Sequence, residues 1–517
     1  MRNKNLVEES IQKIGKSTGI VLSGTVFTLF LGLISRIFIV RFITPNQYGI
    51  YSLGLAITTL LVSLSILGLN HGIPRQISYH RGENKSKVKN LIGSSIGFSI
   101  LMSILSFLFL FLSSNVLATK IFGDPALTTA LRVFSFAIPF SILINIFVSI
   151  FRGFGKDKPK IYFQNIMRGS IFLLLIGLVI GLGLSFIGVI YAYVLSFVVS
   201  ALVFAVYAIK TQIPINFKVN FINSTSKELI LFSIPLLGTS ILFQVMDWTD
   251  TILLGVFKSS EIVGLYQGAY PLAKTIPLAL GGAGFLFLPI LTGLYSDGKR
   301  DNSRRIYQIS TKWIFYLSLS LFFLLFLFPE MILNFLFGPE YTEASMVLRI
   351  LSLGFLGRAF FGPNGLSLIA IGESNSVFYG DVGGTITNIS LNIALIPYLG
   401  IIGAAIASTV SLIARNGYFT KILLQKFRIH PFSEKYLKQI AISFSILLFF
   451  FILQLLVNVQ LWMLPIFLIA YLLVTLIVNL IFRTFDKEET ELLLKIGKKL
   501  GIKTGLIKKI IKKLQKT

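Results

Sequence analysis

The chain has 517 residues, of which 54% are hydrophobic and only 13% are charged, and its mean hydropathy is +0.82. Soluble proteins carry about 25% charged residues, so this composition excludes an ordinary soluble domain. Because the chain has no cysteine, disulfides, thiolate metal sites and cysteine nucleophiles are excluded as well. The formal net charge of +26 would suggest nucleic-acid binding in a soluble protein, but here the placement of the charges indicates another origin.

Fourteen apolar segments are long enough to cross a bilayer as helices. Their expected bounds are 19–42, 49–70, 91–113, 128–151, 162–183, 187–209, 229–256, 262–294, 309–328, 345–371, 377–397, 400–424, 438–457 and 461–482. The predicted fold class is therefore all-α, a polytopic membrane protein with about 14 transmembrane helices.

The basic residues alternate along these predicted spans. Of the 47 Lys and Arg residues, 39 lie in one set of alternate loops that includes both ends of the chain, whereas the other loops hold only Lys120 and Lys258. The positive-inside rule then predicts a multi-pass protein of the cell membrane with both termini in the cytoplasm. The net charge follows mostly from this topology and adds an attraction to anionic membrane lipids, so nucleic acid is not an expected partner.

Two parts of the chain resemble each other at a spacing of 215 residues. YGIYSLGLAI resembles VGLYQGAYPL, which aligns Gly49 with Gly264, and the same shift aligns Gly188 with Gly403. The first twelve helices are therefore expected to form two six-helix bundles in parallel repeat, followed by two extra helices. The predicted domains are an N-terminal lobe over 15–210, a C-terminal lobe over 226–425, two additional transmembrane helices over 436–483 and a basic amphipathic cytoplasmic tail over 484–517.

Charged residues interrupt several of the apolar spans. Asp247 and Asp250, in FQVMDWTDTILLG, share one face of a helix. Lys274 and Arg358 are expected at a similar depth in other spans, and Arg36 occupies the repeat position that corresponds to Asp250. Charged groups at such depth rarely face lipid, so we expect them to line a polar cavity in which the two lobes bring Arg36 and Asp250 face to face.

In this interpretation Asp247 and Asp250 hold the cations, and Arg36, Lys274 and Arg358 bind an anionic substrate. Two alternatives fit the same pattern. The charges can form static ion pairs between helices, or the two carboxylates can form a site for a cation or a proton.

The eighth predicted span contains a break. Pro271 and Pro277 flank Lys274, and the cluster GGAG follows at 281–284, which predicts a bent or broken helix that is suited to a gate. The chain has no Walker loop, no dinucleotide fingerprint and no cluster with metal-ligand spacing. We therefore expect no enzymatic activity, no catalytic residue, no cofactor and no bound metal.

Several motifs resemble a known family. ITPNQYGIYSLGLAI (43–57), LGLNHGIPRQISYHRG (67–82), FRGFGK (151–156) and FSIPLLG…DWTDTILLGVFKSSEIVGLYQGAY (232–270) are similar to the polysaccharide-export branch of the multidrug/oligosaccharidyl-lipid/polysaccharide flippase superfamily. This resemblance implies a flippase that translocates a polyprenyl-phosphate-linked oligosaccharide or polysaccharide repeat unit across the cytoplasmic membrane by alternating access. It also implies a cationic cavity between two lobes, and a glycan polymerase or glycosyltransferases as further partners.

Two other functions remain open at this stage. A cation-coupled multidrug antiporter of the same superfamily would use Asp247 and Asp250 as ion ligands. A non-transporting subunit of a glycan-synthesis complex would need neither carboxylate for coupling.

Overall fold

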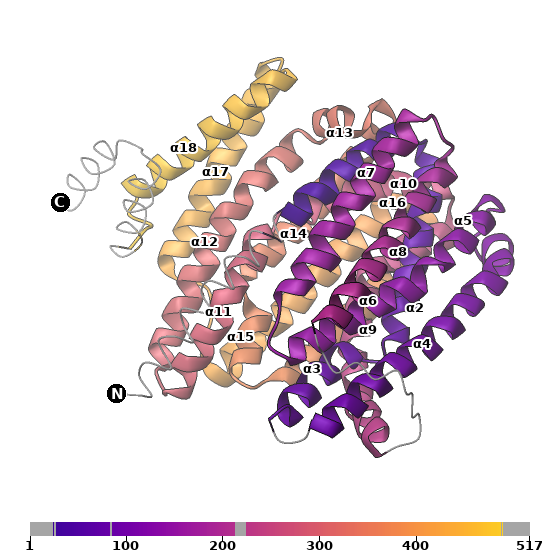
Figure 1. Cartoon of the computed structure of the whole chain (residues 1–517). Coiled ribbons are helices and arrows are strands. Elements are labelled where there is room, and N and C mark those ends of the chain that lie inside the picture. Colours follow the sequence, from indigo (N-terminus) through magenta and orange to yellow (C-terminus); the bar gives the residue numbers. More distant parts are fainter. Residues whose placement is uncertain (1–23, 25–26, 83–84, 212–223, 487–488, 490–517) are drawn as a thin grey trace. The chain divides into compact units, whose positions relative to one another are not determined.

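The computed structural model describes residues 24, 27–82, 85–211, 224–486 and 489. Within these residues the chain is helical, with no strand, so the all-α fold class is confirmed (Figure 1). The tail over 490–517, which the sequence predicts to be amphipathic, and the first 23 residues lie outside the described part of the chain.

The first half of the described chain begins with a helix over residues 27–42. The elements that follow are α2 (Pro45–Ser65), α3 (Leu69–His80), α4 (Lys85–Val116), η1 (Leu117–Ile121), α5 (Ala126–Ser135), α6 (Ala137–Gly153), η2 (Lys160–Met167), α7 (Arg168–Gly181), α8 (Phe186–Lys210) and α9 (Ser224–Phe257). Of these, η1 and η2 are π-helical.

The second half of the described chain is also helical and contains the longest helix, α16 (Ser374–Phe427). Its other elements are α10 (Ser260–Ala273), α11 (Leu278–Ser296), α12 (Arg300–Leu327), α13 (Pro329–Phe337), η3 (Pro339–Ala344), α14 (Ser345–Phe361), α15 (Asn364–Ala370), α17 (Glu434–Leu456), η4 (Leu461–Met463) and α18 (Leu464–Ile481).

The helices match the expected membrane spans. In the described residues, ten helical segments are long and apolar enough to cross a membrane. One of them, α16, contains two expected spans, because its backbone turns at Gly400 with φ 55° and ψ −129°. Glycine tolerates this conformation because it has no Cβ.

The predicted break in the eighth span is also present. A turn over residues 274–277 separates α10, which contains Pro271 in its last turn, from α11, which begins directly after Pro277. Proline removes a backbone donor and crowds the preceding turn, so two prolines six residues apart prevent a continuous helix. The expected span over 262–294 is therefore two shorter helices.

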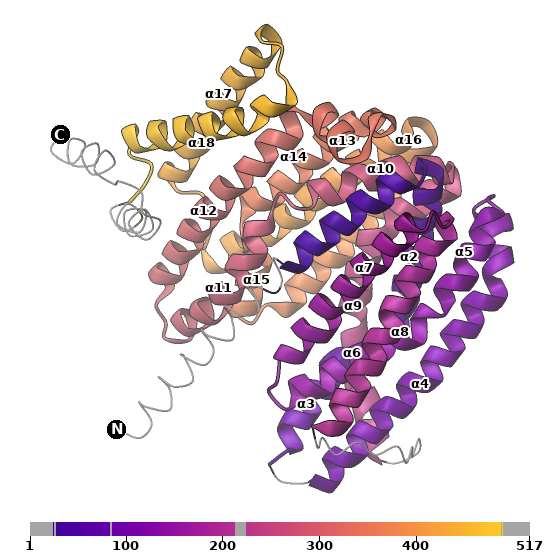
Figure 2. The same ribbon diagram turned by 45° about the horizontal axis from the view of Figure 1, so that its top comes forward.

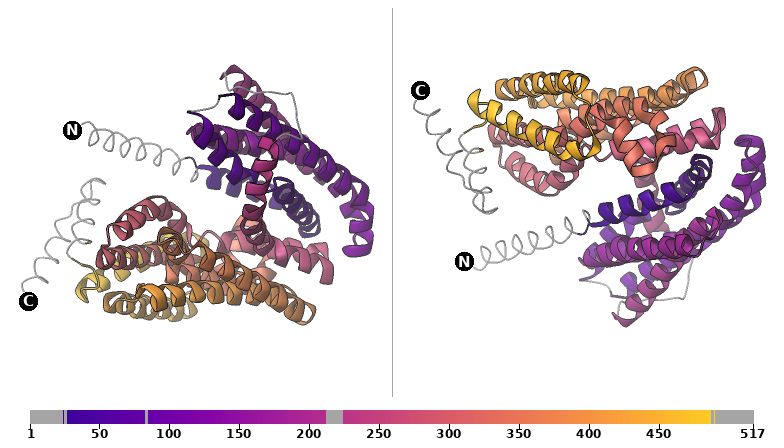
Figure 3. Two further views of the ribbon diagram at one scale, coloured as in Figure 1. Left: turned by 90° about the horizontal axis from the view of Figure 1, so that it is seen from below. Right: turned by 90° about the horizontal axis from the view of Figure 1, so that it is seen from above.

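The chain forms two compact units. Unit 1 comprises Met1–Tyr270, Leu333–Val347 and Asp381–Ser411, and unit 2 comprises Pro271–Ile332, Leu348–Gly380 and Leu412–Thr517. In unit 1, α2 and α3 pack against α9, and α6 and α7 pack against α8. In Figures 1 and 2, α2, α4, α6 and α8 run alongside one another, and the two views of Figure 3 show these indigo to magenta helices as one bundle.

In unit 2, α11 packs against α12 and α15, and α17 and α18 form an antiparallel pair beside α12 (Figure 2). A core cluster holds α11, α12, α15 and the end of α16 together. Its buried members are Phe287, Leu291, Tyr307, Leu368, Ala370, Phe419, Leu423 and Ile429.

The internal repeat has a counterpart in the packing of unit 1. A Cβ atom on Gly49 would lie 1.6 Å from the carbonyl oxygen of Ser260, and one on Gly264 would lie 1.9 Å from that of Pro45. The shift of 215 that relates Gly49 to Gly264 also relates Pro45 to Ser260. The contact is therefore reciprocal, as expected where a two-fold axis passes between two copies of one motif.

Candidate functional site

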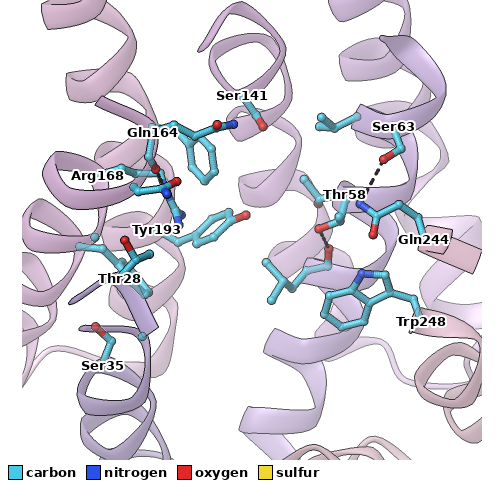
Figure 4. A pocket seen from close by; sticks show the side chains of 18 of the residues that line it. Thr28, Ser35, Thr58, Ser63, Ser141, Gln164, Arg168, Tyr193, Gln244 and Trp248 are labelled. Atoms are coloured by element: carbon cyan, nitrogen blue, oxygen red, sulfur yellow. Dashed lines mark hydrogen bonds between the residues drawn. The ribbon is translucent and has the colours of Figure 1, made fainter. Parts of the chain in front are cut away.

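Unit 1 contains a cavity of about 860 Å³. It is lined by side chains from the helix over 27–42, from α2, α6, η2, α7, α8 and α9, from the start of α3 and from the middle of α10. Figure 4 shows Gln164, Arg168 and Tyr193 on one side of this cavity and Thr58, Ser63, Gln244 and Trp248 on the other. A volume of this order is typical of a site for a small molecule or for the head of a larger one.

The lining of the cavity is polar and cationic. Arg36, Arg168 and His71 line it together with many hydroxyl and amide side chains, and no Asp or Glu is among its lining residues. Buried cations in a protein interior are normally balanced by carboxylates. The main electrostatic feature of this cavity is that its two arginines face no carboxylate among the lining residues.

Neither arginine has an anionic partner among the described residues. Arg168 donates from Nε to the carbonyl oxygen of Gln164 at 3.2 Å, and its guanidinium lies 4.8 Å from the ring centroid of Phe197. Arg36 forms no ion pair and no hydrogen bond within the described chain. Arg36, Arg168 and the hydroxyl-bearing Tyr51 line the same cavity.

Local structure explains how Arg168 reaches the cavity. It is the first residue of α7 and follows the π-helical segment η2, which also carries Gln164. Segments of π-helix shift the direction of the side chains around them and occur frequently at functional sites. Gln164 donates to Asn145 on α6 at 3.0 Å, which fixes the amide that lies one turn before Arg168.

A second polar cluster in unit 1 surrounds Asp250, whose side chain is only 1% exposed. Its carboxylate accepts hydrogen bonds from the hydroxyl of Tyr266 at 2.5 Å and from the amides of Asn392 at 2.7 Å and Asn388 at 3.1 Å. Ser408 donates a fourth bond. None of these four donors is a cation, so hydrogen bonds alone stabilise the charge.

The bend at Gly400 assembles this cluster. Asn388 and Asn392 are four residues apart and share a face of the first limb of α16, whereas Ser408 lies on the second limb. The bend returns the second limb towards the first, and Ser408 lies 3.5 Å from Asn388. The side-chain oxygens of both asparagines are buried without a hydrogen-bond partner in the described chain.

The cavity and the Asp250 cluster occupy equivalent positions of the repeat. A shift of 214 or 215 relates Arg36 to Asp250, Tyr51 to Tyr266, and Tyr193 to Ser408. The first member of each pair lines the cavity, and the second belongs to the cluster around Asp250. The repeat therefore places a cation in one copy and an anion in the other, and within the described residues Arg36 and Asp250 do not form an ion pair.

The other predicted site residues lie in different places. Asp247 is half-buried in unit 1 and accepts a hydrogen bond from the hydroxyl of Tyr270 at 3.0 Å. Lys274, exposed in the turn before α11, and Arg358, half-buried in α14, both belong to unit 2 and do not line the cavity of unit 1.

Arg168 is a lining residue that the sequence analysis did not select. The count of basic residues in alternate loops includes it, although it falls six residues inside the predicted span over 162–183. That position is the signal that could have identified it. Among the described residues, no group of three His, Cys, Asp or Glu side chains has the geometry to hold a metal ion.

The amino-acid sequence is similar to those of several membrane proteins of glycan assembly. A putative O-antigen transporter from Shigella flexneri is 24% identical over 388 residues, which cover 73% of this chain and 89% of the relative. A probable low-salt glycan biosynthesis flippase, Agl15, from Haloferax volcanii is 27% identical over 165 residues, which cover 32% of this chain and 35% of the relative.

Two solved structures share the fold. The inward closed conformation of the lipid II flippase MurJ has a TM-score of 0.74 at 17% identity and covers 90% of this chain and 98% of its own. The inward-facing conformation of a multidrug resistance MATE family transporter has a TM-score of 0.68 at 16% identity, with coverage of 78% and 94%.

Family profiles match both parts of the repeat. The MatE profile matches residues 235–394. The profile of the polysaccharide biosynthesis protein family matches residues 14–294, which is more than half of the chain. These matches confirm the resemblance to the polysaccharide branch of the superfamily, and the chain belongs to the polysaccharide biosynthesis protein family.

Proposed function

We propose that this multi-pass membrane protein is a flippase that translocates a polyprenyl-phosphate-linked oligosaccharide or polysaccharide repeat unit across the cytoplasmic membrane by alternating access. The observation that carries the proposal is the pair Arg36 and Arg168, which share a polar cavity without any carboxylate. A phosphate group cannot enter hydrocarbon without a very large loss of hydration free energy. Two unbalanced guanidinium groups offset that loss through bidentate hydrogen bonds.

The polar wall of the cavity fits the other half of such a substrate. Sugar hydroxyls both donate and accept hydrogen bonds, and the lining offers amides and hydroxyls that do the same. The polyprenyl tail is itself apolar and can stay in the lipid while the head crosses. In this account both termini are cytoplasmic, and a glycosyltransferase or a glycan polymerase supplies or consumes the substrate.

Asp250 is the proposed coupling group. It is buried away from any cation of the described chain, so its charge depends on four hydrogen-bond donors. The unbonded oxygens of Asn388 and Asn392 lie on the same cluster and can join the carboxylate as ligands of a small cation, or the carboxylate can take up a proton. Either event changes the charge of the cluster and can bias the two conformations of a transporter.

The cavity favours this function over multidrug antiport. A cationic drug needs an accessible carboxylate, but the cavity of unit 1 has none, and Asp250 is 1% exposed. No catalytic step is required, because the substrate leaves unchanged. The same reasoning distinguishes the protein from a non-transporting subunit, for which an unbalanced cationic cavity has no use.

The test is transport by the purified protein in vesicles. A fluorescent polyprenyl-diphosphate-linked oligosaccharide is placed in the inner leaflet, and its appearance outside is followed with a membrane-impermeant quencher. We expect transport by the native protein, and at least about a tenfold loss for Arg36→Gln with Arg168→Gln. The control Arg81→Gln changes an exposed arginine and should transport normally. Transport at the native rate by the double variant would refute the assigned anion site, and a native protein that moves no lipid would support the non-transporting subunit.

A further inference from the structure

The wall of the cavity opposite Arg168 has features that anion binding alone does not require. Trp248 on α9 extends its indole towards the centre of the cavity, close to Thr58 on α2 (Figure 4). Within the described residues its indole N–H donates to no acceptor, and its ring stacks on no other aromatic ring. A tryptophan in a protein interior normally finds a partner for its N–H group, so this one is available to a ligand.

Gln244 completes the wall. Its amide nitrogen donates to the hydroxyl of Ser63 at 3.2 Å, which fixes the orientation of the side chain and leaves its carbonyl oxygen without a partner in the described residues. An anchored amide beside an open indole combines a hydrogen-bonding edge with an apolar plane. Phosphate needs neither feature, whereas a pyranose ring presents both an apolar C–H face and an edge of hydroxyl groups.

We propose that Trp248 and Gln244 form a monosaccharide subsite that selects the sugar joined directly to the carrier phosphate. This inference rests on the proposed function, in which Arg36 and Arg168 hold the phosphate, and Arg168 lies on the opposite wall of the cavity (Figure 4). The indole stacks on the C–H face of the first pyranose, and the carbonyl oxygen of Gln244 accepts a hydrogen bond from one of its hydroxyls. The cavity of about 860 Å³ accommodates this first sugar with its phosphates, so the wall discriminates between substrates by their first sugar.

The chain offers a direct optical test. It contains three tryptophans, and the other two, Trp313 and Trp462, belong to unit 2. Trp313→Phe with Trp462→Phe leaves Trp248 as the single reporter. The probes are farnesyl diphosphate and the same lipid with glucose, galactose or N-acetylglucosamine attached to the terminal phosphate.

We expect every sugar-bearing probe to change the emission of Trp248, and farnesyl diphosphate to bind without that change. The dissociation constants of the three sugar-bearing probes should differ from one another by at least about threefold, because the fixed amide of Gln244 can bond a hydroxyl in one sugar that is absent or differently oriented in another. Identical emission with and without a sugar, or equal affinities for all three sugars, would overturn the subsite and leave the anion site intact. Failure of every probe, farnesyl diphosphate included, would overturn both proposals.

Radiolabelled binding provides a second measurement that does not depend on fluorescence. Trp248→Leu should lower the affinity for the sugar-bearing probes about fivefold, the size expected for one lost ring contact, and leave the affinity for farnesyl diphosphate unchanged. The matched control is Trp462→Leu, which removes an exposed tryptophan from unit 2. Equal losses for both classes of probe would indicate a structural role for Trp248 and refute the proposal.

Discussion

Lys312 and Glu489 form an ion pair inside unit 2, with each residue only 3% exposed. The ammonium group of Lys312 also donates to the carbonyl oxygen of Thr484 at 2.9 Å and lies 5.4 Å from the ring centroid of Phe485. Nearby, Asp486 accepts contacts from Arg305 at 3.0 Å and from Lys435. The chain that leaves α18 is thereby attached to the starts of α12 and α17.

Removing one member of this pair should destabilise the protein strongly. Lys312→Met leaves a buried carboxylate uncompensated, and we expect a loss of about 3–5 kcal/mol in unfolding free energy. Glu489→Gln should cost less, because an amide can still accept from Lys312. Lys438→Met breaks the exposed pair with Glu434 and should change stability by about 0.5 kcal/mol or less. Thermal unfolding in detergent measures all three, and equal effects of the Lys312 and Lys438 changes would contradict the argument.

Lys274 and Arg358 are proposed substrate-binding cations in unit 2. The double variant Lys274→Ala with Arg358→Ala should still insert into the membrane, and transport should fall by about tenfold or more. Lipid-linked glycan should then accumulate on the inner side of the membrane, which extraction and mass spectrometry would detect. The control Arg300→Ala with Lys421→Ala removes two exposed basic residues and should have no effect. Normal export in the first variant would exclude both residues from the substrate path.

Asp250→Asn tests the coupling proposal. The amide cannot carry the charge that Tyr266 and Ser408 stabilise, so transport should lose its dependence on an imposed proton or sodium gradient. Binding of farnesyl diphosphate should remain within about twofold, because Asp250 does not line the cavity. Flux measured with and without each gradient provides the readout. Asp297→Asn, at an exposed carboxylate, is the control, and undiminished gradient dependence in the Asp250 variant would disprove coupling at this residue.

Gly49→Ala should prevent normal packing of unit 1, since the added carbon would lie 1.6 Å from a backbone oxygen that cannot move aside alone. Overpacking typically costs about 1–3 kcal/mol, and a clash between two backbones belongs at or above the upper end. Gly264→Ala should behave alike. Gly32→Ala is the matched control, because a Cβ atom there meets no other atom within 4 Å. Expression level and monodispersity in detergent distinguish these outcomes, and a well-behaved Gly49 variant would be inconsistent with the close contact.

His430, in the segment between α16 and α17, should make stability depend on pH. Burial and then the nearby Arg304 lower the pKa of His430 below its usual value of 6.5. Between the lowered pKa and 6.5, His430 is protonated in the unfolded chain but neutral in the folded chain. The free energy of unfolding therefore falls as the pH decreases through that range. Thermal unfolding between pH 5 and 8 should show this slope, and His430→Gln should reduce it. An unchanged slope in that variant would assign the effect to other groups.

Sequence patterns predicted the helical spans and the break near Lys274, because apolar length and proline act locally. They did not predict the environment of Asp250. Its donors Asn388, Asn392 and Ser408 lie more than 135 residues away and are uncharged, so no charge count or motif identifies them. Arg168 lies near the start of its predicted span, where a basic residue counts towards the cytoplasmic loops and does not stand out as a cavity residue. The partner of Lys312 could not be predicted either, since a buried ion pair depends on where the chain returns after α18.

The reciprocal contact of Gly49 with Gly264 has a consequence for the origin of the chain. Each copy of the motif meets the other through the same glycine and the same backbone oxygen four residues earlier. A half-length ancestor with one such glycine would have been self-complementary, and two molecules would have closed on each other as a homodimer. In the present chain the two copies differ at one corresponding position, where the first carries the positive Arg36 and the second the negative Asp250.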